Sequence, residues 1–88
     1  MMHPYWIKFE RQSYPTLFNL GVGVTADSED DARNMVLSKM EDAPLIVSVT
    51  IIKDMRELDQ GHVVPNMGSW FQRGIWFPKG YETLGSRL

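Results

Sequence analysis

The strongest pattern in the chain is a helical one between Ser28 and Pro44, and it restricts the fold more than any other feature. Ser28 is a good N-cap, and Asp31 stands where a capping box carries its acidic member. Glu29, Asp30 and Asp31 place negative charge at the positive end of the helix dipole. Apolar residues recur on one helix face, at Ala32, Met35, Val36 and Met40. The sequence therefore predicts one amphipathic helix, which Pro44 stops.

The segments on either side of this helix alternate apolar and polar residues with a period of two, which is typical of strands. Strands are predicted at residues 5–10, 17–25, 45–54 and 70–77. The strand at 45–54 is rich in β-branched residues and is predicted to be the central or longest one, covered by the helix. Residues 55–69 lack a clear period, apart from one helical turn at 56–60 and a β-turn at 64–67.

The element order β-β-α-β-β predicts an α+β fold, with an antiparallel sheet of three to four strands and one helix packed on one face. The other face of the sheet is expected to stay open for a partner. Gly21 and Gly23 share one face of the second strand, where another element can approach closely. The 88 residues indicate a single domain, 1–88, ordered over about residues 4–78, with a mobile tail at 79–88.

Composition narrows the classes of function. The chain has no cysteine, which excludes a disulfide, a thiolate metal site and a cysteine nucleophile. No apolar run is long enough to cross a membrane and the N-terminus is unlike a signal peptide, so a cytoplasmic protein without a membrane partner is expected. Nine of the 11 acidic residues lie between Asp27 and Asp59, which argues against a nucleic-acid partner and suits a basic protein. A solvated helix face and loop charges explain the same excess.

Residues able to carry out catalysis are few. His62 could titrate near neutral pH and, with Asp59 and Arg73, could in principle cleave RNA. The chain offers no evident second acid or base and no basic approach for phosphate, and His62 equally fits a hydrogen bond within its own loop. We therefore expect no enzyme, no catalytic residue and no cofactor. Scattered carboxylates and one usable histidine also predict no metal site.

The aromatic residues near the C-terminus form a second cluster of interest. Trp70, Phe71, Trp76 and Phe77 surround Arg73, an arrangement that loosely resembles the stacking platform of an RNA-recognition sheet. Residues 73–77 depart from the sequence pattern of that platform. In so small a domain, half of these rings must also face the core. Those left exposed beside Arg73 suit a protein-binding hot spot, where Trp, Tyr and Arg are enriched.

Two motifs resemble a recurring ending of small bacterial proteins: L-D-x-x-H-V-x-P-N-M-G at residues 58–68, and R-G-I-W-F-P at residues 73–78. The same order of elements precedes them, namely an aromatic strand at 5–10, G-V-G-V-T-A at 21–26 and an acidic helix start at 27–32. The chain thus resembles immunity proteins of interbacterial toxin systems, such as those of contact-dependent inhibition, over about residues 5–78. The resemblance implies a cognate protein toxin as the partner and carries over no catalytic residue.

The leading hypothesis is therefore an immunity-type protein that blocks a toxin, which could be a nuclease. A nuclease would be basic, so acidic residues such as Asp54, Glu57 and Asp59 could occupy its nucleic-acid cleft. The resemblance adds Asp59, His62, Asn66 and Arg73 as characteristic positions, with roles in the loop or in binding. The expected partner-binding residues are Asp54, Glu57, Asp59, His62, Asn66, Trp70 and Arg73. Two alternatives stay open: an accessory or self-associating domain that forms a homodimer through an edge strand, and a small ribonuclease dependent on His62.

Overall fold

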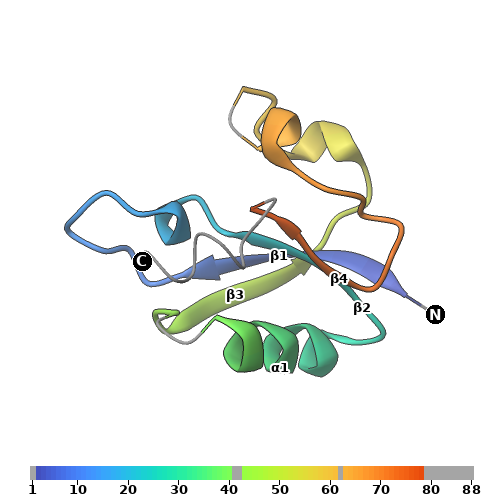
Figure 1. Ribbon diagram of the computed structural model, residues 1–88, viewed down its shortest axis with the longest axis horizontal. Helices are drawn as coiled ribbons and strands as arrows, with labels where there is room; N and C mark the ends of the chain where they lie inside the picture. The colour runs from blue at the N-terminus through green and yellow to red at the C-terminus, as the bar shows by residue number, and fades with distance from the viewer. Residues whose placement is uncertain (1, 41–42, 62, 79–88) are drawn as a thin grey trace.

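The structure is a computed structural model that describes residues 2–40, 43–61 and 63–78. It contains one α-helix and one antiparallel sheet of four strands, which confirms the predicted α+β fold. The helix is α1 (Glu29–Lys39), and the strands are β1 (His3–Phe9), β2 (Val22–Ala26), β3 (Ile46–Ile51) and β4 (Gly74–Phe77). The strand order is β3-β1-β2-β4, so β1 and β2 are central (Figure 1).

The first strand follows the predicted alternation. Tyr5, Ile7 and Phe9 are buried in the cluster that faces α1, whereas Lys8 and Glu10 are exposed. Because successive side chains of a strand point to opposite faces, Trp6 lies on the side of the sheet away from the helix. This strand therefore contributes to two cores at once.

The helix begins where its capping signals predict. The Ser28 hydroxyl oxygen accepts a hydrogen bond from the Asp31 N–H at 3.0 Å, and the Asp31 carboxylate accepts one from the Asp27 N–H at 2.9 Å. The first bond satisfies a donor that a helix start leaves free, and the second holds the residue before the N-cap. The helix ends at Lys39, before Pro44 is reached, and Met40 caps it. The predicted core stripe is confirmed, since its four apolar side chains are all buried: Ala32, Met35, Val36 and Met40.

The second strand is shorter than predicted. It starts at Val22, because Leu17–Asn19 forms a 3-10 turn instead of a strand. The Asn19 side chain bonds to the backbone of the preceding loop, accepting from the Gln12 N–H at 2.8 Å and donating to the Gln12 carbonyl at 3.3 Å. Gly21 then takes a positive φ of 118°, a conformation that glycine adopts freely. The local side-chain bonds outweigh the apolar alternation here.

The prediction that the third strand is central or longest is wrong. The strand covers Ile46–Ile51 rather than 45–54 and lies at an edge of the sheet, where it pairs with β1. Its β-branched side chains suit any extended strand, so the composition did not specify a buried position. Leu45 and Val47 are accordingly 73% and 64% exposed.

The expected open face of the sheet is in fact covered. The segment from Ile52 to Trp70 folds over the side opposite α1 (Figure 1). A second buried cluster forms there from Ile52, Leu58, Val63, Trp76 and Phe77. We call this segment and its cluster the loop layer. It contains two 3-10 turns, Met55–Glu57 and Val64–Asn66, in place of the predicted helical turn at 56–60 and β-turn at 64–67.

Gly21, just before β2, and Gly23 within it admit the indole rings of Trp6 and Trp76, as the predicted close approach requires. A Cβ on Gly21 would lie 2.6 Å from the Trp6 ring, and one on Gly23 would overlap the Trp76 ring. The Trp6 and Trp76 rings are themselves 6.0 Å apart. Aromatic rings that cover strand glycines stabilise the register of neighbouring strands.

The fourth strand begins at Gly74 rather than at residue 70. Residues 70–73 form a turn, so Trp70 and Phe71 do not alternate with Trp76 and Phe77 across the sheet. Both Trp76 and Phe77 are buried. No helix in the described part of the chain has the length and apolar character needed to cross a membrane.

Candidate protein-binding surface

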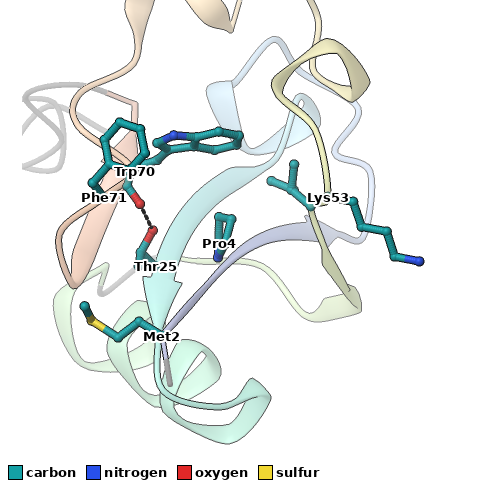
Figure 2. A pocket seen from close by; sticks show the side chains of 7 residues that line it. Met2, Pro4, Thr25, Lys53, Trp70 and Phe71 are labelled. Atoms are coloured by element: carbon teal, nitrogen blue, oxygen red, sulfur yellow. Dashed lines mark hydrogen bonds between the residues drawn. The ribbon is translucent and has the colours of Figure 1, made fainter.

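A surface pocket of about 440 Å³ opens where the start of β1, the end of β3 and the turn at 70–73 meet (Figure 2). Its lining is largely apolar and consists of Met2, Pro4, Thr25, Ile52, Lys53, Trp70 and Phe71. We call these residues the aromatic pocket. Its volume is within the range that accommodates a large partner side chain or a small ligand.

Two aromatic rings form one wall of the aromatic pocket. The rings of Trp70 and Phe71 meet edge to face with centroids 6.1 Å apart, and the Trp70 ring also meets that of Trp76 at 6.0 Å. The contact with Trp76 holds Trp70 against the buried cluster of the loop layer, whereas Phe71 is 80% exposed. A large exposed aromatic side chain beside an apolar pocket is typical of binding surfaces.

Thr25 fixes the position of this wall. Its hydroxyl, in a side chain only 2% exposed, donates a hydrogen bond to the Trp70 carbonyl at 2.6 Å. Thr25 lies on the same face of β2 as Gly23, so the bond joins the central sheet to the turn at 70–73. Thr25 was not among the residues predicted from the sequence. The available signal was a polar β-branched residue in an otherwise apolar and glycine-rich strand.

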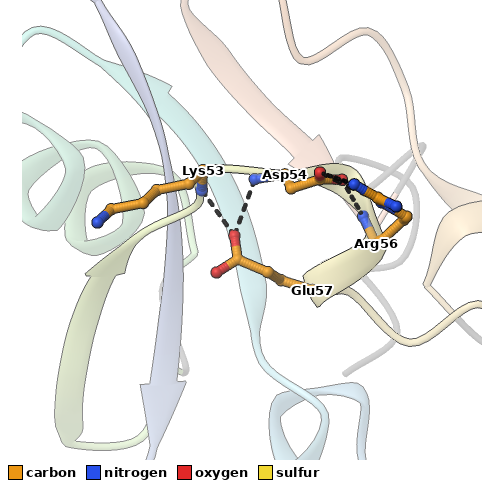
Figure 3. Close-up of polar contacts among 4 residues, drawn as sticks. All are labelled: Lys53, Asp54, Arg56 and Glu57. Carbon is orange, nitrogen blue, oxygen red and sulfur yellow. Dashed lines mark hydrogen bonds and ion pairs between the residues drawn. The ribbon is translucent and has the colours of Figure 1, made fainter.

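Lys53, which lines the aromatic pocket, is followed by a turn that contains the acidic residues Asp54 and Glu57 (Figure 3). The Glu57 carboxylate accepts hydrogen bonds from the N–H groups of Lys53 and Asp54, at 2.7 and 2.8 Å. The Asp54 carboxylate in turn accepts from the Arg56 N–H at 2.9 Å. This reciprocal arrangement is a capping box around the Met55–Glu57 turn. We call residues 53–57 the acidic turn.

Arg56 partly neutralises the acidic turn. Its guanidinium bonds the Asp54 carboxylate at 2.8 Å and lowers the pKa of that group, with the Arg56 backbone N–H as the second cause. The same hydrogen bond raises the pKa of Arg56. Since both side chains are well exposed, the pair can open for a partner at low cost. Asp54 and Glu57 therefore have structural roles that sequence reasoning did not assign.

Three predicted residues belong to the segment that follows. The Asp59 carboxylate accepts from the Gly61 N–H at 2.8 Å, and its carbonyl accepts from Val63 and Val64. These bonds hold the chain turn that precedes Val64–Asn66. The backbone of Asn66 lies in that 3-10 turn, and His62 lies outside the described residues.

Arg73 is directed toward the helix. Its guanidinium donates to both carboxylate oxygens of Asp31, at 3.0 and 2.5 Å, and lies 3.8 Å from Asp27. The hydrogen bond from Arg73 is the main cause that lowers the pKa of Asp31, followed by the bond from the Asp27 N–H. Of the predicted set, the structure thus places Trp70 in the lining of the aromatic pocket, Asp54 and Glu57 in the turn that follows Lys53, and Arg73 at the start of α1.

A second exposed surface lies along the outer edge of β3. Its apolar side chains are 43–73% exposed and belong to Leu37, Leu45, Val47 and Ile51. A groove of about 380 Å³ runs between α1 and the start of β3, where Leu37 and Leu45 face it. We call these four side chains the β3 edge surface. None of them was among the predicted binding residues, because the sequence placed β3 at the centre of the sheet.

Within residues 2–40, 43–61 and 63–78, no three His, Cys, Asp or Glu side chains converge to hold a metal ion. No protein-family model, curated protein or solved structure matches the chain. The aromatic pocket with its acidic turn, and the β3 edge surface, are therefore the features on which a function can be argued.

Proposed function

We propose that this protein is an immunity-type inhibitor that binds and neutralises a cognate bacterial toxin in the cytoplasm through the aromatic pocket. The observation that carries the proposal is the largely exposed Phe71 ring beside an apolar pocket. The sequence resemblance of residues 58–68 and 73–78 to immunity proteins supports the choice of partner.

The aromatic pocket has the components of a binding hot spot. Phe71 offers apolar area that a partner can bury, and Trp70 is already fixed by its ring contacts and by the bond to Thr25. Little side-chain or backbone freedom is then lost on binding, which favours affinity. A partner side chain that enters the pocket would meet Ile52 and Pro4.

The acidic turn supplies the carboxylates that support a basic partner. Within residues 53–57 Lys53 and Arg56 balance Asp54 and Glu57, so the excess of negative charge comes from Asp59, which gives residues 53–59 a net charge of −1. A basic toxin surface, such as the nucleic-acid cleft of a nuclease, would be attracted to these carboxylates. Such attraction speeds association at low salt and weakens as salt screens it.

Growth rescue is the direct test of the proposal. Candidate toxin domains from neighbouring genes would be expressed with and without the protein, and the purified pair would be titrated calorimetrically. We expect Phe71→Ala to weaken binding by about 30-fold, the loss typical of a hot-spot residue. Tyr14→Ala is the matched control, since Tyr14 is also exposed but lies in the 11–16 loop. Equal affinity of wild type and Phe71→Ala, or no rescue, would contradict the proposal.

A second candidate function, self-association, is favoured by the β3 edge surface, which is separate from the aromatic pocket. The ribonuclease hypothesis depends on His62, which lies outside the described residues.

A further inference from the structure

The outer edge of β3 has little protection against pairing with another strand, since its one irregularity is a β-bulge near Val47, opposite Lys8 and Phe9. Within the described part of the chain, β3 pairs with β1 and no segment pairs with its other side. Ile46–Ile51 contains no charged residue and no proline, the two residue classes that commonly block an edge. The opposite edge strand, β4, is four residues long and lies between Arg73 and Pro78. The two edges of the sheet therefore differ in their capacity to accept a strand.

The backbone register identifies which groups of β3 are available. The Ile52 N–H donates to the Pro4 carbonyl at 2.9 Å, and Val49 lies opposite Ile7 in the same ladder. Antiparallel residues alternate between pointing toward one neighbour and toward the other. The N–H and C=O groups of Val49 and Ile51 therefore point away from β1, toward the free edge.

The sequence of β3 is nearly the same read in either direction around Val49. When two copies pair antiparallel about this residue, Val47 lies opposite Ile51 of the second copy, and Ser48 lies opposite Thr50. Val47 and Ile51 are 64% and 43% exposed, so each would bury apolar area. Apolar pairs and hydroxyl pairs directly across a sheet are both stabilising. A shift to pairing about Thr50 would instead place Lys53 opposite Val47, so Val49 is the favoured centre.

Charge and shape are compatible with this pairing. The two Lys53 side chains lie at opposite ends of the paired strands, roughly 27 Å apart at about 3.4 Å per residue, which is beyond the screening length. Tyr5 and Ile7 pair with Ile51 and Val49, which places these β3 side chains on the face of the sheet that carries α1. The two helices would therefore lie on the same side of the joined sheet, with Leu37 and Leu45 of each copy beside the junction.

We infer that the β3 edge surface binds a second copy of this chain, and that the two four-stranded sheets join into one of eight strands. A paired segment of about six residues is small for a protein interface, so the affinity is modest, with a Kd on the order of 10 μM. The paired segment ends next to Ile52 and Lys53 of the aromatic pocket, whereas Trp70 and Phe71 lie outside the junction, so the dimer and the proposed function are tested with separate variants.

Sedimentation velocity on the full chain tests the mass. We expect a concentration-dependent shift from the 10.1 kDa monomer toward twice that mass. Val47→Lys should hold the protein as a monomer, because two lysines would be added to the paired edge. Tyr14→Lys, which adds the same charge to an exposed residue of the 11–16 loop, should leave the dimer unchanged. A wild-type protein that stays monomeric at concentrations about 50 times the expected Kd would overturn the inference.

Disulfide cross-linking tests the register. Because the chain has no cysteine, Val49→Cys introduces a single thiol. Paired residues at the centre of an antiparallel junction have Cα atoms about 5.5 Å apart, within disulfide range. Val49→Cys should therefore oxidise to a covalent dimer, while Ser48→Cys, on the other face and out of register, should not. Faster cross-linking of Ser48→Cys than of Val49→Cys would reject the pairing. If Val47→Lys is monomeric but still binds the toxin, dimer formation and the proposed function are independent of each other.

Discussion

The guanidinium of Arg73 and the carboxylate of Asp31, which are 42 positions apart in sequence, form a two-point ion pair. The pair joins the residue before β4 to the first turn of α1, and so connects one edge of the sheet to its helix. Asp31 at the same time accepts the Asp27 N–H and donates its own N–H to Ser28. One carboxylate thus serves both helix initiation and tertiary structure.

This ion pair predicts a pH-dependent stability. Arg73 lowers the pKa of folded Asp31 below its ordinary value of 3.8. The contribution is therefore present above the unfolded pKa and is lost as the pH falls through the lower, folded pKa. We expect Arg73→Ala to lower the denaturation midpoint at pH 7, and the difference from wild type to shrink below about pH 4. Urea titrations from pH 7 to pH 2 measure this difference in denaturation midpoint. Arg11→Ala, in an exposed loop, should show no such trend, and a difference that is constant with pH would contradict the assignment.

The N-cap of α1 gives a second prediction. Ser28→Ala removes the acceptor of the Asp31 N–H, bonded at 3.0 Å, and should lower the free energy of unfolding by about 1 kcal/mol. Ser38→Ala is the matched control, because the Ser38 hydroxyl bonds the Met35 carbonyl inside the same helix and alanine favours helix. Thermal or urea unfolding followed by circular dichroism distinguishes the two. Equal losses for both variants would argue against a capping role.

The packing of Trp76 on Gly23 gives a third prediction. A methyl group at residue 23 would overlap the indole ring, so Gly23→Ala must move the ring or β2. We expect a loss of about 2 kcal/mol, as for overpacked cores, together with a change in tryptophan fluorescence. Gly61→Ala is the control, because its new methyl would meet only the Asp59 carboxylate, at an ordinary 3.5 Å. A Gly23→Ala protein with wild-type stability and spectrum would show that this contact is not tight.

Thr25 provides a fourth prediction that connects stability to binding. Thr25→Val keeps the shape of the side chain but leaves the Trp70 carbonyl without its 2.6 Å donor, at a cost of about 1–2 kcal/mol. Since this bond positions the turn at 70–73, the affinity for the toxin should also fall. Ser13→Ala, at an exposed loop position, should change unfolding by no more than about 0.5 kcal/mol. If Thr25→Val binds the toxin as tightly as wild type, the turn at 70–73 does not belong to the binding surface.

Several features with local causes were predicted from the sequence, although the Leu17–Asn19 turn and the capping box of Asp54 and Glu57 were not. The start of α1 depends on Ser28 and Asp31, three residues apart, and the buried side of β1 follows from its own alternation. The antiparallel α+β arrangement follows from the order of these elements. Each of these features is specified by residues close together in the chain.

Features with distant causes were not predicted. Strand order is set by which strands meet in space, so the β-branched composition of β3 could not reveal its edge position. The loop layer was missed because residues 55–69 have no period, and its cover of the sheet depends on Trp6 and Trp76 reaching glycines of β2. For the candidate site, Trp70 was anticipated as a binding residue, but the more exposed Phe71 was not, and Thr25, which holds Trp70, is 45 positions away.

The division of the interior into two clusters has an evolutionary consequence. The cluster under α1 and the loop layer lie on opposite faces and share only the strands between them. Substitutions around the aromatic pocket would leave the contacts of Val36 and Ile7 untouched. If the binding partner changes during evolution, the side of the molecule with the aromatic pocket could therefore diversify rapidly, while the side that carries α1 preserves the fold.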